Sequence, residues 1–354
     1  MKDLMNLKTG WNIYKLILII TLAAFVLFGC GGSGDSNTEN STYRVHDAID
    51  LDALIGVNTV YGDLVIESSN LNNLNALESL ETIRGSLWIS DTNLTSLKGL
   101  DNLTTVGKDL YIQRNDNLTS LESLRNLRSV ANQVFIQSNK LIENFAGLES
   151  LSSINELYIG LNDSLVNFTG LENLHSVQSF FTIQNNYSLT SLDGLEGLTK
   201  IRYLSLSGNG VLTSIESLKN ISSIDGSLTI SENDSLTTLE GLESLASIKE
   251  GSLNITDNSA LISLACLKNL STIGRSLIIS SNSSLTELGL EGLNSVGNLI
   301  VPANVAHYQF QISNNNDLCT SQAEDLKFQI HDAGGFGPSY LFCEKTVSDN
   351  KPDC

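Results

Sequence analysis

Carboxylates that return at fixed intervals are the first residues of this sequence whose spacing could do chemistry. Counted from a recurring apolar triplet, they occupy two positions, Glu149, Glu172, Glu196 and Glu243 at one and Glu122, Asp193, Glu216 and Glu240 at the other. If the repeats stack, these side chains form two rows of like charge, which repel each other. Two interpretations stay open: a solvated rim, or a stripe that attracts calcium or a basic partner. Calcium-binding solenoids use Gly-Asp-rich turns, which are missing here, so no metal site is predicted.

The usual catalytic signatures are also missing. His46, His175, His307 and His331 fall at unrelated positions, and the sequence contains no HExxH, CxxC or GxSxG motif. Long parallel β-helices include polysaccharide lyases and hydrolases, but those enzymes gather acids with Arg or Lys on one face and carry long loops. The sequence indicates neither a mixed-charge cluster nor insertions. We therefore predict a protein that is not an enzyme and needs no cofactor.

Charge excludes another class of function. The 354 residues include 39 acidic and 20 basic side chains, a net charge of −19. Binding to phosphate backbones requires Lys and Arg, so we predict no nucleic-acid partner.

Four aromatic side chains occupy the middle position of four successive triplets: Trp88, Tyr111, Phe135 and Tyr158. If the triplets are neighbouring strands, the rings form a stripe on the outer face of a sheet. Such a stripe suits stacking on sugars or burial in a protein partner, but the rings could equally pack on one another. We predict that this stripe is the binding face for an unknown protein or glycan ligand.

The element that positions these residues is a repeat. Eleven triplets of the type Leu228-Thr229-Ile230 recur every 22–25 residues between Leu64 and Val301. Their alternation is that of a strand with one buried face. In the unit GSLTISENDSLTTLEGLESLASI, leucines then follow every third residue, which fits a chain that bends repeatedly and buries one side chain per segment. The pattern predicts a solenoid whose triplets stack as a parallel sheet.

Asparagine forms a second series, five residues after each triplet begins, at Asn115, Asn139, Asn162, Asn186, Asn209, Asn233, Asn258 and Asn282. Because Asn tolerates left-handed backbone and bonds its own turn, we interpret this ladder as structural. A polar binding strip is the alternative.

The first thirty residues have the features of an export signal. Lys2, Lys8 and Lys15 precede an uncharged apolar run of 13 residues, Leu16 to Phe28, which is too short to span a membrane and is typical of a signal peptide. Its end, Leu27-Phe28-Gly29-Cys30, resembles the bacterial lipobox. We expect residues 1–29 to be removed, Cys30 to carry the lipid that binds the membrane, and residues 30–44 to form a flexible tether. Gly31 after the cysteine favours the outer membrane by resemblance to enterobacterial sorting rules, with surface exposure as an option.

Both ends of a solenoid need caps. Val45–Tyr61 is expected to form a degenerate opening coil, and Phe310–Cys343 a C-terminal cap, with Ser321 and Glu324 as a capping box for a short helix. In an exported chain, a Cys319–Cys343 disulfide would tie this helix down. Cys266 takes a small-residue position, and the partners of Cys266 and Cys354 stay open. The predicted solenoid spans residues 45–343, followed by a tail at 344–354.

The repeat unit resembles the receptor L domain, the leucine-rich solenoid of the insulin-receptor and epidermal-growth-factor-receptor ectodomains, and is similar to many bacterial lipoproteins. The resemblance covers about residues 45–343 and implies a mainly β, right-handed parallel β-solenoid of about 10–11 coils. The chain has more coils than a receptor L domain and no cysteine-rich module, so growth-factor binding does not carry over. We predict a lipid-anchored protein of the bacterial cell envelope that acts in surface binding or adhesion. A passive structural component of the envelope is the alternative.

Overall fold

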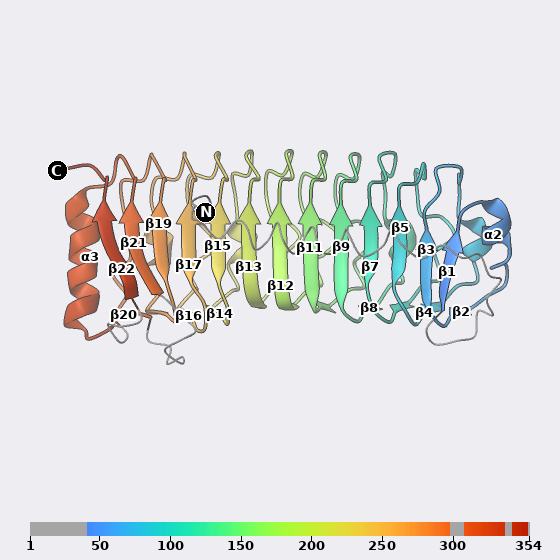
Figure 1. Cartoon of the computed structure of the whole chain (residues 1–354), viewed down its shortest axis with the longest axis horizontal. Coiled ribbons are helices and arrows are strands. Elements are labelled where there is room, and N and C mark those ends of the chain that lie inside the picture. The colour runs from blue at the N-terminus through green and yellow to red at the C-terminus, as the bar shows by residue number, and fades with distance from the viewer. Residues whose placement is uncertain (1–40, 298–307, 337–341, 353–354) are drawn as a thin grey trace, which may run out of the picture. The chain divides into compact units, whose positions relative to one another are not determined.

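The computed structural model describes residues 41–297, 308–336 and 342–352, and within these ranges the side chains of residue 308 and residues 342–345 are not described. The described chain is a parallel β-solenoid of about 11 turns. Its turns follow one another from helix α2 at the first turn to helix α3 at the last (Figure 1). The predicted fold class and the stacking of the triplets are thereby confirmed.

Each turn contributes one strand to a long parallel sheet, and each of the two capped ends adds one more. These strands are β1 (Thr42–Val45), β3 (Asp63–Ile66), β5 (Leu87–Ser90), β7 (Leu110–Gln113), β9 (Gln133–Gln137), β11 (Glu156–Gly160), β12 (Ser176–Gln184), β13 (Lys200–Ser207), β15 (Leu228–Ser231), β17 (Leu253–Thr256), β19 (Leu277–Ser280), β21 (Tyr308–Ser313) and β22 (Phe342–Ser348). The triplets pair first residue to first residue, as Leu87 with Leu110 and Leu228 with Leu253. The first and third residues of the triplets therefore form two inward-facing columns along the sheet, and the middle residues form one outward-facing column.

A second side of each turn is a two-residue strand. These strands are β2 (Thr59–Val60), β4 (Thr82–Ile83), β6 (Thr105–Val106), β8 (Ser129–Val130), β10 (Ser153–Ile154), β14 (Ser223–Ile224), β16 (Ser247–Ile248), β18 (Thr272–Ile273) and β20 (Ser295–Val296). In β12 and β13 this segment and the triplet strand form one continuous element. In these two turns the strand continues around the corner between the two sides, whereas in the other turns the strand is interrupted at that corner.

The leucines at every third residue fill the core, and Leu236, Leu239, Leu242 and Leu245 are all fully buried. Turns use two kinds of corner on the way. Some place a glycine at positive φ, such as Gly170 at 102°, where a Cβ would lie 2.1 Å from the Phe145 carbonyl oxygen. Others form a 3-10 turn: η1 (Asn75–Leu77), η2 (Glu122–Leu124), η3 (Glu216–Leu218) and η4 (Ala265–Leu267).

The N-terminal cap is more structured than expected. β1 pairs with β3 from Thr42 onward, so residues 42–44 belong to the solenoid and not to the predicted tether. The opening coil contains α2 (Ala48–Asp52), whose first amides donate to the carboxylate of Asp47. Leu51 and Leu54 are buried beneath it and close this end of the core.

The C-terminal end corrects two boundaries. β19 pairs directly with β21, so the triplet that continues the sheet is Phe310-Gln311-Ile312, whereas the predicted triplet at Leu299 lies outside the described residues. β22 then pairs with β21 as far as Ser348, so the solenoid does not end at residue 343. The inserted chain between β20 and β21 hid this turn from a count of equal spacings.

Helix α3 (Thr320–Asp332) covers the last turn, with Ala323, Leu326 and Ile330 buried as expected. Its N-cap is Cys319, which makes no side-chain capping bond. The predicted capping by Ser321 is wrong, because the helix begins one residue before it.

Candidate functional site

The four predicted aromatic residues lie on the outer face of β5, β7, β9 and β11, each of them half-buried. Trp88 and Tyr111 stack with ring centroids 3.6 Å apart, Tyr111 and Phe135 are tilted at 5.5 Å, and Phe135 and Tyr158 stack at 4.4 Å. The rings therefore pack on one another, the alternative interpretation of the sequence. The faces of Tyr111 and Phe135 are turned toward neighbouring rings, so the aromatic stripe offers mainly ring edges to a ligand.

Polar side chains border the aromatic stripe on both sides, because most outward positions before and after the middle residues of strands β3 to β12 are polar. On one side lie Asp63, Asp109, Gln133 and Glu156, and on the other Glu67, Gln113, Gln137 and Gln184. Tyr111 donates its hydroxyl proton to Gln133 Oε1 at 3.2 Å, and Gln184 Nε2 donates to the Tyr158 hydroxyl. The two glutamines lie on opposite sides of the aromatic stripe and hold the two phenols in opposite directions.

The phenols of the aromatic stripe stay neutral over a wide range of pH. Burial raises the pKa of Tyr111 to about 12, and the nearby carboxylates of Asp109 and Glu156 act in the same direction. Burial likewise raises the pKa of Tyr158 to about 12, against the opposing effect of the hydrogen bond from Gln184. At neutral pH both hydroxyls are therefore hydrogen-bonding groups without charge.

Two further rings continue this face. Phe180 and Tyr203 stack at 4.7 Å with 17° between their planes, and Phe180 is 44% exposed. The sequence pattern missed them because they occupy the position before the triplet, where earlier strands carry Asp109, Gln133 and Glu156. A search of every outward position, and not of the middle position alone, would have found them.

The predicted asparagines form a continuous internal ladder. All eight are fully buried, and each amide nitrogen donates to a main-chain carbonyl of the preceding turn. From Asn139 onward, each side-chain oxygen accepts the main-chain N–H of the preceding asparagine at 3.0–3.2 Å. Thr92 heads the ladder, and Asn315 and Asn350 extend it through the last turns. These contacts leave no face of the ladder for a ligand.

The left-handed backbone lies one residue before the position we expected. The residues preceding the asparagines have positive φ, as Arg114 at 53° and Asn185 at 55°, while the asparagines themselves do not. The side chain thus bonds the backbone of the neighbouring turn in addition to supporting its own bend.

One acidic row has a local structural partner. Glu149, Glu172, Glu196 and Glu243 each accept the N–H of the corner glycine two residues earlier, at 2.8–2.9 Å. These carboxylates therefore stabilise corners. Within the described ranges, no group of three or more His, Cys, Asp or Glu side chains is arranged to hold a metal ion.

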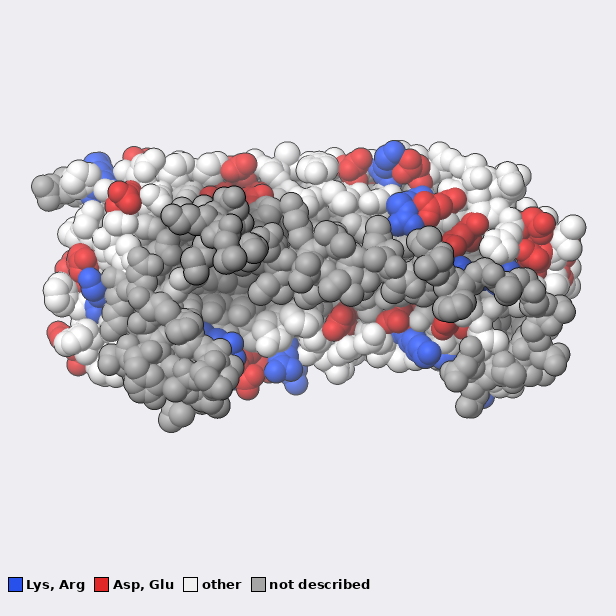
Figure 2. All heavy atoms as spheres, in the orientation of Figure 1, with Lys and Arg blue, Asp and Glu red and all other residues white. Residues whose placement is uncertain are grey.

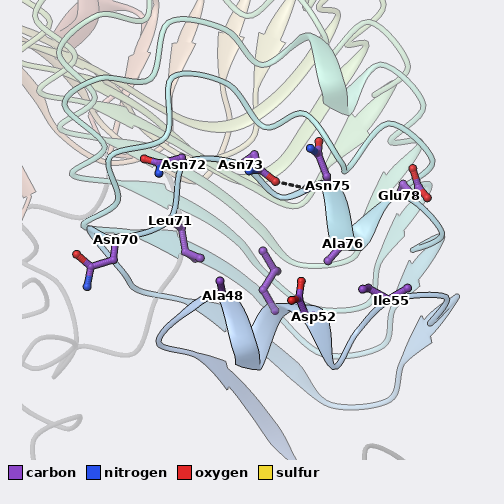
Figure 3. A pocket seen from close by; sticks show the side chains of 11 residues that line it. Ala48, Asp52, Ile55, Asn70, Leu71, Asn72, Asn73, Asn75, Ala76 and Glu78 are labelled. Carbon is purple, nitrogen blue, oxygen red and sulfur yellow. Dashed lines mark hydrogen bonds between the residues drawn. The ribbon is translucent and has the colours of Figure 1, made fainter.

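A groove of about 420 Å³ lies at the N-terminal cap, between α2 and the segment from Asn70 to Glu78. Figure 3 shows Ala48, Leu71 and Ala76 lining its interior, with Asp52 on the helix side and a row of asparagines along the opposite rim. Asn73 Oδ1 accepts the N–H of Asn75 at 3.1 Å, which holds that rim in place. Ile55 at one end is 67% exposed.

The cysteines differ in state. Cys266 is a free thiol whose pKa is raised by burial and then by the nearby carboxylate of Glu243, so it is a poor nucleophile at neutral pH. Cys319 is disulfide-bonded. The side chain of Cys343 and all of Cys30 and Cys354 lie outside the described residues, so the lipidation of Cys30 stays a prediction and the partner of Cys319 is open between Cys343 and Cys354.

Within the described residues, none of the helices has the length and apolarity needed to cross a membrane. The model of the receptor L domain family matches the chain in two segments, residues 57–147 and 222–330. Together these cover more than half of the chain. A search of curated proteins finds no match.

Proposed function

The chain belongs to the receptor L domain family of non-enzymatic ligand-binding domains, and we propose that it is a lipid-anchored binding or adhesion protein of the bacterial cell envelope. In this proposal the lipid on Cys30 attaches it to the outer membrane, and the solenoid presents a ligand-binding face to the surroundings. The outer face of the long sheet is the proposed binding surface.

The observation that supports this surface best is its uneven composition. Six aromatic side chains lie on the outer face between β5 and β13, bordered by amides and carboxylates. The same middle column carries Thr229, Asn254 and Gln311 farther along the sheet. Folding alone requires inward leucines in every turn but does not require outward rings in one half, and aromatic side chains are enriched in binding surfaces.

A binding screen tests the proposal. The purified full chain is presented to arrays of host glycans and surface proteins, and hits are re-measured with the W88A/Y111A double variant. The matched control is T229A/I278A, which changes the same outward column where no rings lie. Loss of binding in the first variant alone supports the aromatic face, provided that both variants keep the wild-type melting temperature within a few degrees.

Two results would count against the proposal. Unchanged binding by W88A/Y111A would remove the aromatic stripe from the binding surface. A screen without any ligand, combined with envelope defects in cells that lack the protein, would favour a passive structural component. Palmitate labelling of the wild type but not of the Cys30→Ser variant tests the anchor separately.

A further inference from the structure

A hollow lies in the surface of the solenoid beside the stacked rings of Phe180 and Tyr203. It measures about 600 Å³ and is lined by Ser176, Val177 and Gln178 of β12, Lys200 and Arg202 of β13, and Asp225 and Glu250 of the next two turns. It lies at the corner between the two-residue strands and the triplet strands. Its lining is more polar than that of the groove at the N-terminal cap.

The corner at the hollow is shorter than the corners of the neighbouring turns. From the last inward residue before the corner to the first inward residue of the triplet, the chain advances three residues in one turn, Ile201 to Leu204. The turn before advances four and the turns after advance four and five, the last from Ile248 to Leu253. The corner from Ile201 to Leu204 is thus shorter than the corners on either side, and the pairing of β12 with β13 shifts register between Val177 and Phe180.

Charged side chains of three turns meet here, so the sequence-based expectation that no mixed-charge cluster exists is wrong. Arg202 reaches over one turn to Glu250 at 3.4 Å, and Lys249 bonds Asp225 at 2.7 Å. The hydrogen bond from Lys249, with the added charges of Lys200 and Arg202, lowers the pKa of Asp225. Figure 2 shows basic and acidic side chains side by side at the lower edge of this part of the solenoid.

The balance of these charges favours an anion. Lys200, Arg202 and Lys249 outnumber Asp225 and Glu250, whereas the whole chain carries a net charge of −19. An arginine has five N–H donors in a planar fork. Arg202 donates to Glu250 through one terminal nitrogen. Donors therefore remain for a carboxylate or sulfate that enters the hollow.

Beside the hollow lies an aromatic platform. The Arg202 guanidinium is 5.4 Å from the centroid of the Tyr203 ring, which stacks on Phe180. The Tyr203 ring lies over Gly226, where a Cβ would approach the ring to 2.3 Å. On the side away from Tyr203, the strand before Phe180 carries Glu156 at the equivalent position. Phe180 is thus the ring of this face best placed to receive a sugar by stacking.

We propose that the corner hollow and Phe180 form a binding site for an anionic saccharide. Arg202 and Lys200 bind the carboxylate or sulfate, and Phe180 packs against the sugar ring. Gln178, whose amide nitrogen donates to Ser153 at 3.1 Å, offers its amide oxygen to a sugar hydroxyl. This inference rests on the proposed binding function and gives its ligand a chemical class.

The test uses the full chain in detergent micelles and three probes: an oligogalacturonate, the same oligomer with methyl-esterified carboxylates, and a sulfated oligosaccharide. We expect calorimetry to show binding of at least one anionic probe and at least tenfold weaker binding of the ester. R202Q should weaken anion binding at least tenfold. F180S should weaken the binding of the oligosaccharides without changing the melting temperature of the protein. E250Q should strengthen anion binding several-fold, because Arg202 loses its competing carboxylate.

R125Q is the matched control, since Arg125 also forms an exposed ion pair between turns, with Asp101 at 3.3 Å. Equal effects of R125Q and R202Q, or equal affinity for the charged and esterified oligomers, would overturn the proposed site. If no anionic probe binds while W88A/Y111A still abolishes capture of a ligand found in the screen, the anionic-saccharide inference fails and the surface-binding function stands. If both measurements fail, both proposals fall.

Discussion

Replacing one asparagine of the internal ladder should destabilise several turns at once. Asn186 is fully buried. Its side-chain oxygen accepts the main-chain N–H of Asn162 at 3.1 Å, and its amide nitrogen donates to the carbonyl of Ile159 at 3.2 Å. N186A removes the acceptor of this buried N–H and one donor to this carbonyl, which also lies within the β11–β12 ladder. At about 1–3 kcal/mol for the unsatisfied N–H and about 0.5–1.5 kcal/mol for the bond lost at the carbonyl, the free energy of unfolding should fall by about 1.5–4.5 kcal/mol.

Asn173 provides a matched control, because its amide nitrogen also donates to a carbonyl of the preceding turn, that of Glu149 at 2.9 Å, but at the surface. In N173A water can satisfy the released carbonyl, so the loss should be about 0.5–1 kcal/mol. The two variants delete the same side chain and differ mainly in burial.

Urea unfolding measures the overall loss, and native-state hydrogen exchange locates it, since long repeat proteins can unfold in parts. We expect the amide of Asn162 to exchange much faster in N186A and at the wild-type rate in N173A. Equal losses in the two variants, within about 0.5 kcal/mol, would refute the argument that buried amide bonds hold the turns together.

Three further outcomes can be checked directly. G170A should lower the free energy of unfolding, measured in urea, by at least ~2 kcal/mol, because the φ of 102° at Gly170 and the nearby carbonyl exclude a Cβ. G210A should change it by less than ~1 kcal/mol, because the space around the Cβ position is open. Tyr158 should ionise near pH 12 in an ultraviolet titration; since its pKa is raised on folding, its contribution to stability is complete below about pH 10 and declines as the pH rises toward 12. Non-reducing peptide mapping should find Cys319 joined to Cys354, because Cys319 pairs with Lys351, three residues earlier in the sequence.

The same peptide mapping tests the Cys319–Cys343 disulfide predicted from the sequence. The backbone of Cys343 lies at the start of β22, beside the Tyr308–Gln309 step of β21. Lys351, the neighbour of Cys319, follows the other end of that strand. A disulfide requires Cα atoms within about 7 Å. A Cys319–Cys343 peptide would therefore contradict the register at the C-terminal cap.

The periodic part of the fold could be predicted from the sequence because each turn obeys the same rule. Burial of Leu236, Leu239 and Leu242 follows from the three-residue spacing alone, and the asparagine positions follow from the triplets. The ends could not be predicted in this way, since the insertion before β21 breaks the spacing and α2 replaces part of a turn. Periodicity is evidence for a repeat only where neighbouring turns have equal lengths.

The surface was harder to predict for a different reason. The hollow lies at a corner only one residue shorter than the preceding one, and two of its ion-paired residues, Arg202 and Glu250, are 48 positions apart in the sequence. The stacking of Trp88 on Tyr111 also depends on side-chain rotation, which the column of outward positions does not determine.

The asparagine ladder has a consequence for how such a chain can change in evolution. Every inner rung makes the same bonds to its neighbours, and successive rungs lie 23–25 residues apart from Asn115 to Asn282. Removing one whole period, such as residues 140–162, would bring Asn139 next to Asn186 with the same donors and acceptors facing each other. Duplication and deletion of gene segments can therefore alter the number of turns without disturbing the interior. The distance between the two capped ends becomes a heritable length that changes in fixed steps.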